Sequence, residues 1–73
     1  MRRYTVVLIP DEQEGGYTVI IPALPGLTTG GETCDEALAH ARDAIALYIA
    51  AVEAAGEPVP VEGIHPALAE VAV

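Results

Sequence analysis

Side chains that could carry out catalysis are few in this sequence, and their spacing keeps them apart. The chain contains no serine and a single cysteine, Cys34, which is followed six residues later by His40. The surrounding residues predict a helix, and residues six apart on a helix point to different sides of it. A thiol–imidazole pair requires the two groups within hydrogen-bonding distance, so we do not expect one here.

Metal binding is not supported by the residue spacing either. The two histidines, His40 and His65, lie far apart, and the chain has neither an H-x-x-x-H nor a C-x-x-C pattern. A two-metal nuclease needs several carboxylates that converge on a sheet, yet the predicted strands carry almost none apart from Glu70. We therefore expect no catalytic residue, no metal site and no cofactor. A small hydrolase is an alternative that a metal-dependent RNA cleavage assay would detect.

The charge of the chain favours a protein partner over a nucleic acid. Eleven acidic residues against three arginines and no lysine give a net charge of −8 at pH 7. Phosphate binding depends on basic side chains, so we do not expect direct nucleic-acid binding. An acidic surface accelerates the encounter with a basic partner. The alternative is that the acidity only maintains solubility.

The sequence shows neither a targeting segment nor a membrane span. The apolar run that follows Arg2 and Arg3 ends at Pro10 and alternates as a strand does, unlike a signal peptide. No apolar stretch approaches the roughly 20 residues that a membrane-spanning helix requires. We expect a cytoplasmic protein with a single domain over residues 1–73.

The first part of the chain predicts a β-hairpin with an acidic tip. Residues 3–9 (RYTVVLI) and 16–21 (GYTVII) are rich in β-branched side chains and predict two antiparallel strands. The connection between them is longer than a two-residue turn, so we expect it to protrude. Its acidic residues are Asp11, Glu12 and Glu14.

A rigid turn, a short strand and a helix cap come next. Pro25 and Gly26 suit the two central positions of a type II turn, because proline fixes φ and glycine permits a positive φ. Residues 27–30 then predict a third strand. Thr33 and Glu36 have the spacing of a capping box, in which each residue satisfies a free N–H group at a helix start.

One long helix is predicted over residues 34–55, and Gly56 followed by Pro58 ends it. Apolar residues at helical spacing predict a core-facing stripe. The stripe consists of Leu38, Ala41, Ile45, Tyr48, Ile49 and Val52. Leu47 lies off the stripe and is therefore a candidate contact for a partner.

The C-terminal part is less strongly patterned. Residues 56–66 hold three prolines and two glycines and predict irregular structure. Residues 67–73 (ALAEVAV) alternate weakly, which favours a last strand over the alternative of a helical turn. The predicted fold class is α+β, with a three- or four-stranded, mainly antiparallel sheet in the order β-β-β-α-β and one long helix on one face.

Both faces of the hairpin are largely apolar, although one helix can cover only one of them. One face holds Tyr4, Val6, Leu8, Tyr17, Val19 and Ile21; the other holds Thr5, Val7, Ile9, Thr18 and Ile20. The second face must be covered by the C-terminal segment, by another copy or by a different protein. We therefore predict a homo-oligomer, either a dimer or a tetramer, that acts as an interaction module.

The stretch from the turn to the helix resembles the HicB family of antitoxins. The similarity comprises a P-x-L-P-G turn, a Thr/Gly segment and a helix that begins with Glu-Ala, preceded by a G-x-Y-x-V strand. The matching positions of the turn, segment and helix are Pro22, Leu24, Pro25, Gly26, Thr29, Gly30, Thr33, Glu36 and Ala37. Because these residues form a turn, a strand and a cap, we assign them to the fold rather than to a binding site.

The resemblance implies a partial RNase H-like fold and an antitoxin that binds and blocks a small, basic, mRNA-cleaving toxin of the HicA type. Larger members add a C-terminal DNA-binding domain, for which 73 residues leave no room, so we expect a short form. Charge complementarity predicts toxin contact at the acidic tip or the exposed sheet face. Two alternatives are a free-standing oligomeric HicB-like domain with another partner and a small RNase H-like hydrolase.

Overall fold

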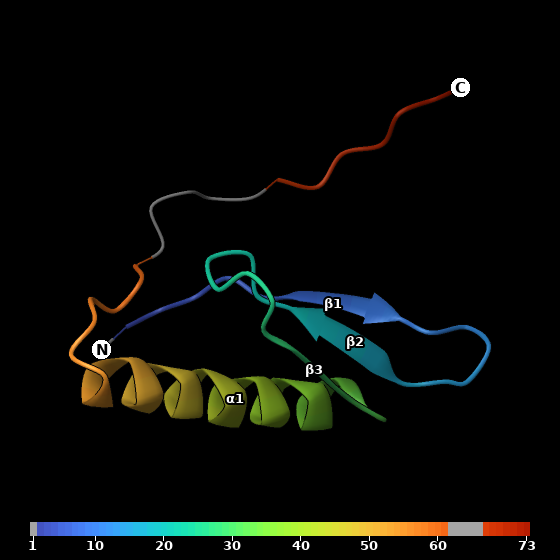
Figure 1. Ribbon diagram of the computed structural model, residues 1–73. Coiled ribbons are helices and arrows are strands. Elements are labelled where there is room, and N and C mark those ends of the chain that lie inside the picture. The colour runs from blue at the N-terminus through green and yellow to red at the C-terminus, as the bar shows by residue number, and fades with distance from the viewer. Residues whose placement is uncertain (1, 62–66) are drawn as a thin grey trace.

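The computed structural model describes residues 2–61 and 67–73 and contains three strands followed by one long helix (Figure 1). The strands are β1 (Val7–Pro10), β2 (Tyr17–Ile20) and β3 (Thr28–Gly31), and the helix is α1 (Cys34–Ala54). The strands form an antiparallel sheet in the order β1-β2-β3. The predicted α+β class is thus confirmed, with β-β-β-α as the element order.

The hairpin is confirmed, but its first strand is shorter than the predicted residues 3–9. Val7 pairs with Ile20 and Ile9 pairs with Thr18. Extending this register toward the N-terminus would place Thr5 opposite Pro22, which has no N–H group to donate. The proline turn therefore ends the ladder, although Tyr4 and Val6 still pack against the core.

The turn after β2 has the predicted geometry and also fills the core. Gly26 has a φ of 86°, and the Leu27 N–H donates to the Leu24 carbonyl oxygen at 3.1 Å, as a type II turn around Pro25 and Gly26 requires. Leu24 is fully buried. The P-x-L-P-G stretch thus reverses the chain and supplies an apolar side chain beneath it.

Both ends of α1 carry the signals that the sequence predicted. The Thr33 side chain accepts from the Glu36 N–H at 3.1 Å, and the Glu36 carboxylate accepts from the Glu32 N–H at 3.1 Å. At the C-terminus, the Gly56 N–H donates to the Glu53 carbonyl and the Glu57 N–H to the Val52 carbonyl. This pair of bonds is a Schellman motif. The helix ends one residue before the predicted position, at Ala54.

The fully buried core is small and lies between α1 and the centre of the sheet. It consists of Val19, Ile21, Leu24, Ala37 and Ala41. Ile45 and Tyr48 of the predicted stripe pack against it. Leu38 was predicted to face the core but is 43% exposed, because the helix turns Ala37 rather than Leu38 toward the sheet.

Glycine in β3 allows this close approach of helix and sheet. A Cβ atom added to Gly31 would lie 2.5 Å from the Ala37 backbone nitrogen, which is shorter than any normal van der Waals contact. The helix packs mainly against β3 and less against β2, and β1 forms the opposite edge of the sheet (Figure 1). The helix is therefore displaced toward one edge rather than centred.

The predicted last strand is wrong. Residues 67–73 adopt neither strand nor helix and are exposed throughout, with Leu68 at 89% and Val71 at 83%. The weak alternation of these residues provides no side-chain packing that would offset the entropy of ordering a strand. The sheet of the described chain therefore has three strands, and its face opposite α1 is not covered by residues 67–73.

Candidate partner-binding surface

Groups that could perform chemistry are not gathered in the part of the chain that the structure describes. Within residues 2–61 and 67–73, no three His, Cys, Asp or Glu residues are placed to hold a metal ion. Cys34 is exposed, and the His40 Nδ1 atom lies 2.6 Å from the Gly30 carbonyl oxygen. His40 thus joins α1 to β3, while His65 lies outside the described residues. No helix in these residues is long and apolar enough to cross a membrane.

The acidic tip between β1 and β2 is organised by the carboxylate of Asp11. Its Oδ1 atom accepts from the Gln13 N–H at 3.0 Å and from the Glu14 N–H at 3.1 Å. The Asp11 backbone also bonds to Gly15 and Gly16, and both glycines have a φ of 79°. Asp11, predicted only as a partner contact, therefore also holds the loop in shape through its short side chain.

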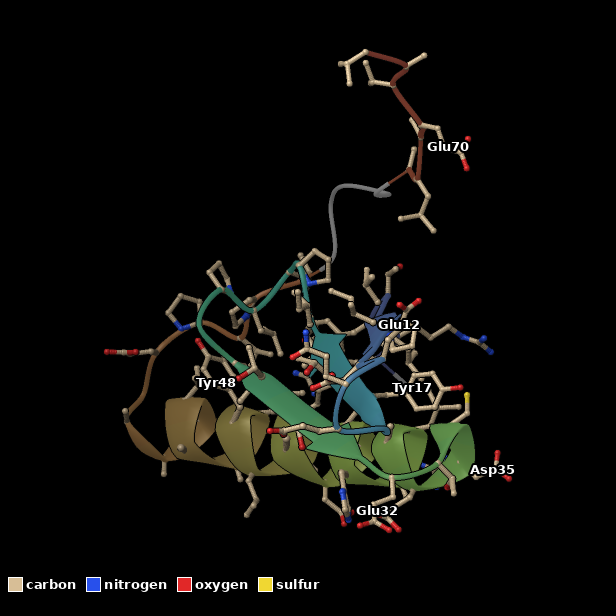
Figure 2. All side chains as sticks on the ribbon, turned by 90° about the vertical axis from the view of Figure 1, so that its right-hand side faces the viewer. Glu12, Tyr17, Glu32, Asp35, Tyr48 and Glu70 are labelled. Atoms are coloured by element: carbon tan, nitrogen blue, oxygen red, sulfur yellow. The ribbon has the colours of Figure 1, made fainter. Side chains whose placement is uncertain are left out.

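A hollow of about 460 Å³ lies beside this tip and is bordered by three carboxylates, those of Asp11, Glu14 and Glu32. Figure 2 looks onto this end of the molecule and labels Glu12 and Glu32. Sequence reasoning did not identify Glu32 as a candidate contact. It joins the tip because Gly31 pairs with Tyr17 across the sheet. The strand pairing, rather than any local motif, brings these acids together.

The sheet face opposite α1 presents two rows of residues across the strands. Val7, Ile20 and Thr28 form one row, and Ile9, Thr18 and Gly30 form the next, as the register dictates. Ile9 is 44% exposed and Ile20 39% exposed. We call these two rows the open sheet face. It brings together the predicted contacts Val7, Thr18 and Ile20, and Ile9 leads through Pro10 into the acidic tip.

Two further predicted contacts lie elsewhere. Thr5 is half-buried and precedes β1, next to the open sheet face in sequence. Leu47 is 73% exposed on α1, in the helical layer, so the structure does not place it with the sheet residues. A single exposed leucine is common on protein surfaces and carries no argument alone.

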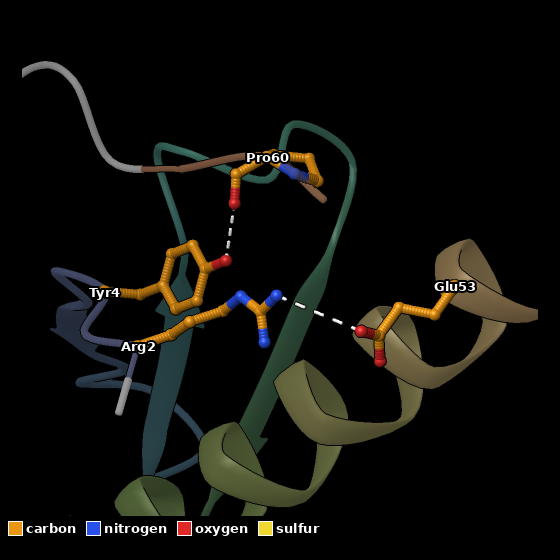
Figure 3. Close-up of polar contacts among 4 residues, drawn as sticks. All are labelled: Arg2, Tyr4, Glu53 and Pro60. Carbon is orange, nitrogen blue, oxygen red and sulfur yellow. Dashed lines mark hydrogen bonds and ion pairs between the residues drawn. The ribbon is translucent and has the colours of Figure 1, made fainter. Parts of the chain in front are cut away.

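The segment after the helix returns to the N-terminal residues (Figure 3). The Tyr4 hydroxyl donates to the Pro60 carbonyl oxygen at 2.5 Å, which joins residues far apart in the sequence. Arg2 and Glu53 form an ion pair at 3.9 Å with both side chains about half exposed. An exposed pair of this kind contributes little stability. The hydrogen bond from Tyr4 to Pro60, rather than the ion pair, is thus the contact that joins this segment to the N-terminal residues.

Comparison with known proteins agrees with the fold and the motif. A family model described as the HicB-like antitoxin of bacterial toxin–antitoxin systems matches residues 4–70. A UPF0150 protein of Thermoplasma acidophilum is 43% identical over 58 residues, which cover 80% of this chain and 83% of that protein. A UPF0150 protein of Synechocystis is 41% identical over 61 residues, covering 84% and 76%. No solved structure matches.

The match extends across both strands of the hairpin, the turn, β3 and α1, and it includes every residue of the P-x-L-P-G turn and the helix cap. These are the positions whose roles in turning, capping and close packing are described above. The chain belongs to the HicB-like antitoxin family of bacterial toxin–antitoxin systems.

Proposed function

We propose that this chain is a non-enzymatic antitoxin module that binds and neutralises a basic, mRNA-cleaving toxin of the HicA type. The observation that carries the proposal is one continuous surface, in which the open sheet face leads directly into the acidic tip. Among the described residues, no three carboxylates are placed to hold a metal ion, as a two-metal nuclease requires. Since the toxin acts on mRNA, we place this function in the cytoplasm.

The two parts of this surface suit the two parts of a protein interface. Ile9 and Ile20 provide an apolar centre that water leaves on binding, which supplies most of the affinity. The carboxylates of Asp11, Glu14 and Glu32 border the hollow beside the tip. Together with Glu12 of the same loop they provide an acidic border, which attracts a basic partner and orients it. Leu47 lies on the other layer, so we assign it no part in this contact.

The test is titration of the purified chain with the small basic protein encoded beside it, together with an mRNA cleavage assay. We expect Ile20→Asp to weaken binding at least tenfold, because it places a charge at the apolar centre. Leu47→Asp, the same kind of change on an exposed apolar side chain of α1, serves as the control and should leave binding unchanged. Equal affinity for the Ile20→Asp variant and the unaltered chain would refute the proposal.

The acidic border is tested separately through the salt dependence of binding. We expect Glu12→Gln with Glu14→Gln to lower the association rate about tenfold at low salt and to flatten its dependence on ionic strength. Asp43→Asn with Glu57→Gln removes the same charge from exposed sites elsewhere and is the matched control. A rate that falls equally in both double variants would assign the effect to net charge, not to the tip.

A second candidate is a free-standing oligomeric HicB-like domain with an unrelated partner. It is favoured by the open sheet face, which residues 67–73 leave uncovered and which a second copy could cover. In that case Ile20→Asp would turn the oligomer into a monomer, and no toxin gene would lie beside this one. Either role includes self-association, which we propose for a chain of this size because its fully buried core is small.

A further inference from the structure

A groove along α1 exists because the helix is displaced toward β3. Its volume is about 360 Å³, and it lies between the N-terminal segment before β1 and the helix. Tyr4 and Val6 line one side, and Leu38, Ile45 and Ile49 line the other. Leu38 is more exposed than the sequence predicts because it lines this groove instead of the core.

The charged side chains that line the groove are both arginines. Among the described residues that line it, only Arg2 and Arg42 are charged. They are two of the three basic residues in a chain of net charge −8. Arg2 also forms an ion pair with Glu53 at 3.9 Å, which offsets part of its charge, so Arg42 is the main cation for a ligand in the groove. The groove is thus apolar along its floor and basic at its edge, on a molecule that is otherwise acidic.

Residues 67–73 have the complementary character. They are apolar except for one acidic residue, Glu70, and Leu68, Val71 and Val73 are among the most exposed apolar side chains described. Seven residues in extended form span about 20 Å. Along the helix, the groove from Leu38 to Ile49 measures about 16 Å at 1.5 Å per residue. The segment therefore fits the groove in length, polarity and charge.

We propose that residues 67–73 of a second copy occupy this groove and that two copies exchange these segments reciprocally. Glu70 then meets the basic edge formed by Arg2 and Arg42, and Leu68 and Val71 enter the apolar floor. Reciprocal exchange closes a two-fold dimer, and each contact is made twice.

The molecule's own segment does not occupy the groove. Residues 67–73 are exposed throughout and extend away from the sheet and the helix (Figure 1). The groove of each copy is therefore open to the segment of a second copy.

This proposal rests on the self-association proposed above and is tested by sedimentation of the full chain. We expect Leu68→Asp with Val71→Asp to raise the dimer dissociation constant at least tenfold, because both apolar contacts are lost twice per dimer. Leu47→Asp, at an exposed apolar side chain of α1 that does not line the groove, is the matched control and should change the constant less than twofold. Ile20→Asp tests the competing interface on the open sheet face. If Ile20→Asp dissociates the dimer while the segment variant does not, or if the unaltered chain is monomeric, the proposal is overturned.

A charge exchange tests the register of the contact. Arg42→Glu and Glu70→Arg should each raise the dissociation constant about tenfold, because two attractive pairs per dimer become repulsive. The double variant restores both pairs and should return to within threefold of the original value. Failure of the double variant to recover would mean that these residues do not meet.

Cross-linking decides which copy supplies the segment. With Cys34 replaced by Ser, cysteines introduced at Ala46 in the groove and at Val71 should form a disulfide between chains and give a covalent dimer on a non-reducing gel. A disulfide within one chain would overturn the exchange. Toxin binding is measured separately in the Leu68→Asp, Val71→Asp variant. The dimer contact can fail while toxin binding persists, and toxin binding can fail while the dimer contact persists, so the two proposals are tested independently.

Discussion

Asp11 shows how one carboxylate can shape a loop and also contribute charge to a surface. Its side chain accepts two backbone N–H groups, and its backbone bonds to Gly15 and Gly16 close the loop. The neighbouring Glu12 and Glu14 are exposed, and their side chains make no such loop contacts among the described interactions. The effect of the negative charge of Asp11 can therefore be measured separately from the effect of its acceptor oxygen.

At the residue scale, we predict that Asp11→Ala lowers the free energy of unfolding by about 1 kcal/mol, because two N–H groups lose their acceptor. Asp11→Asn keeps an acceptor oxygen and should cost less than half as much. Urea denaturation measures both. If the two variants were equally destabilised, the negative charge rather than the acceptor geometry would hold the loop.

At the scale of elements, the junction of β3 and α1 determines how the molecule is layered. Gly31 allows the strand to approach Ala37, the His40 ring bonds to the Gly30 carbonyl, and the cap at Thr33 begins the helix between them. Because the helix is held against β3, the β1 side of the sheet is left less covered. The groove along Tyr4 and Val6 is a consequence of this junction.

We predict that Gly31→Ala lowers the free energy of unfolding by about 2 kcal/mol, because the added methyl group forces β3 and α1 apart. Thr28→Ala, on an exposed position of the same strand, controls for the loss of strand propensity and should change stability by less than about 0.5 kcal/mol. Thermal and urea unfolding provide the comparison. A Gly31→Ala variant as stable as the original chain would show that the junction is loosely packed.

At the scale of the whole molecule, the core is small and three apolar surfaces remain exposed. The open sheet face, the groove and residues 67–73 all expose apolar side chains, whereas only five of the residues that the structure describes are buried. A 73-residue chain buries only about 60% of its unfolded surface when it folds alone. The self-association and toxin binding proposed above each cover part of this remainder.

We predict that the melting temperature rises by at least about 5 °C when the protein concentration is increased a hundredfold, because association stabilises the folded state by mass action. The Leu68→Asp, Val71→Asp variant should lose this dependence while keeping the monomer fold. Scanning calorimetry at two concentrations measures the shift. A concentration-independent melting temperature of the unaltered chain would contradict self-association.

The sequence alone determined the elements whose causes are local. The type II turn at Pro25-Gly26, the cap at Thr33 and the helix end at Gly56 each depend on the conformational preferences of one or two residues. The hairpin and the α+β class follow from β-branched runs and helical spacing in the same way. The likeness to HicB antitoxins was also visible there, because the motif is carried by these same turn and cap residues.

Only the tertiary structure decided how far the helix is displaced, and this determined the candidate surfaces. Leu38 lies outside the core, Glu32 lies beside the acidic tip, and residues 67–73 lie outside the sheet. Each depends on contacts between residues distant in the chain: Gly31 against Ala37, and Tyr17 opposite Gly31. Hydrophobic periodicity shows that a helix has an apolar side. Which of its apolar side chains are buried depends on how closely the backbones of the helix and the strand approach each other.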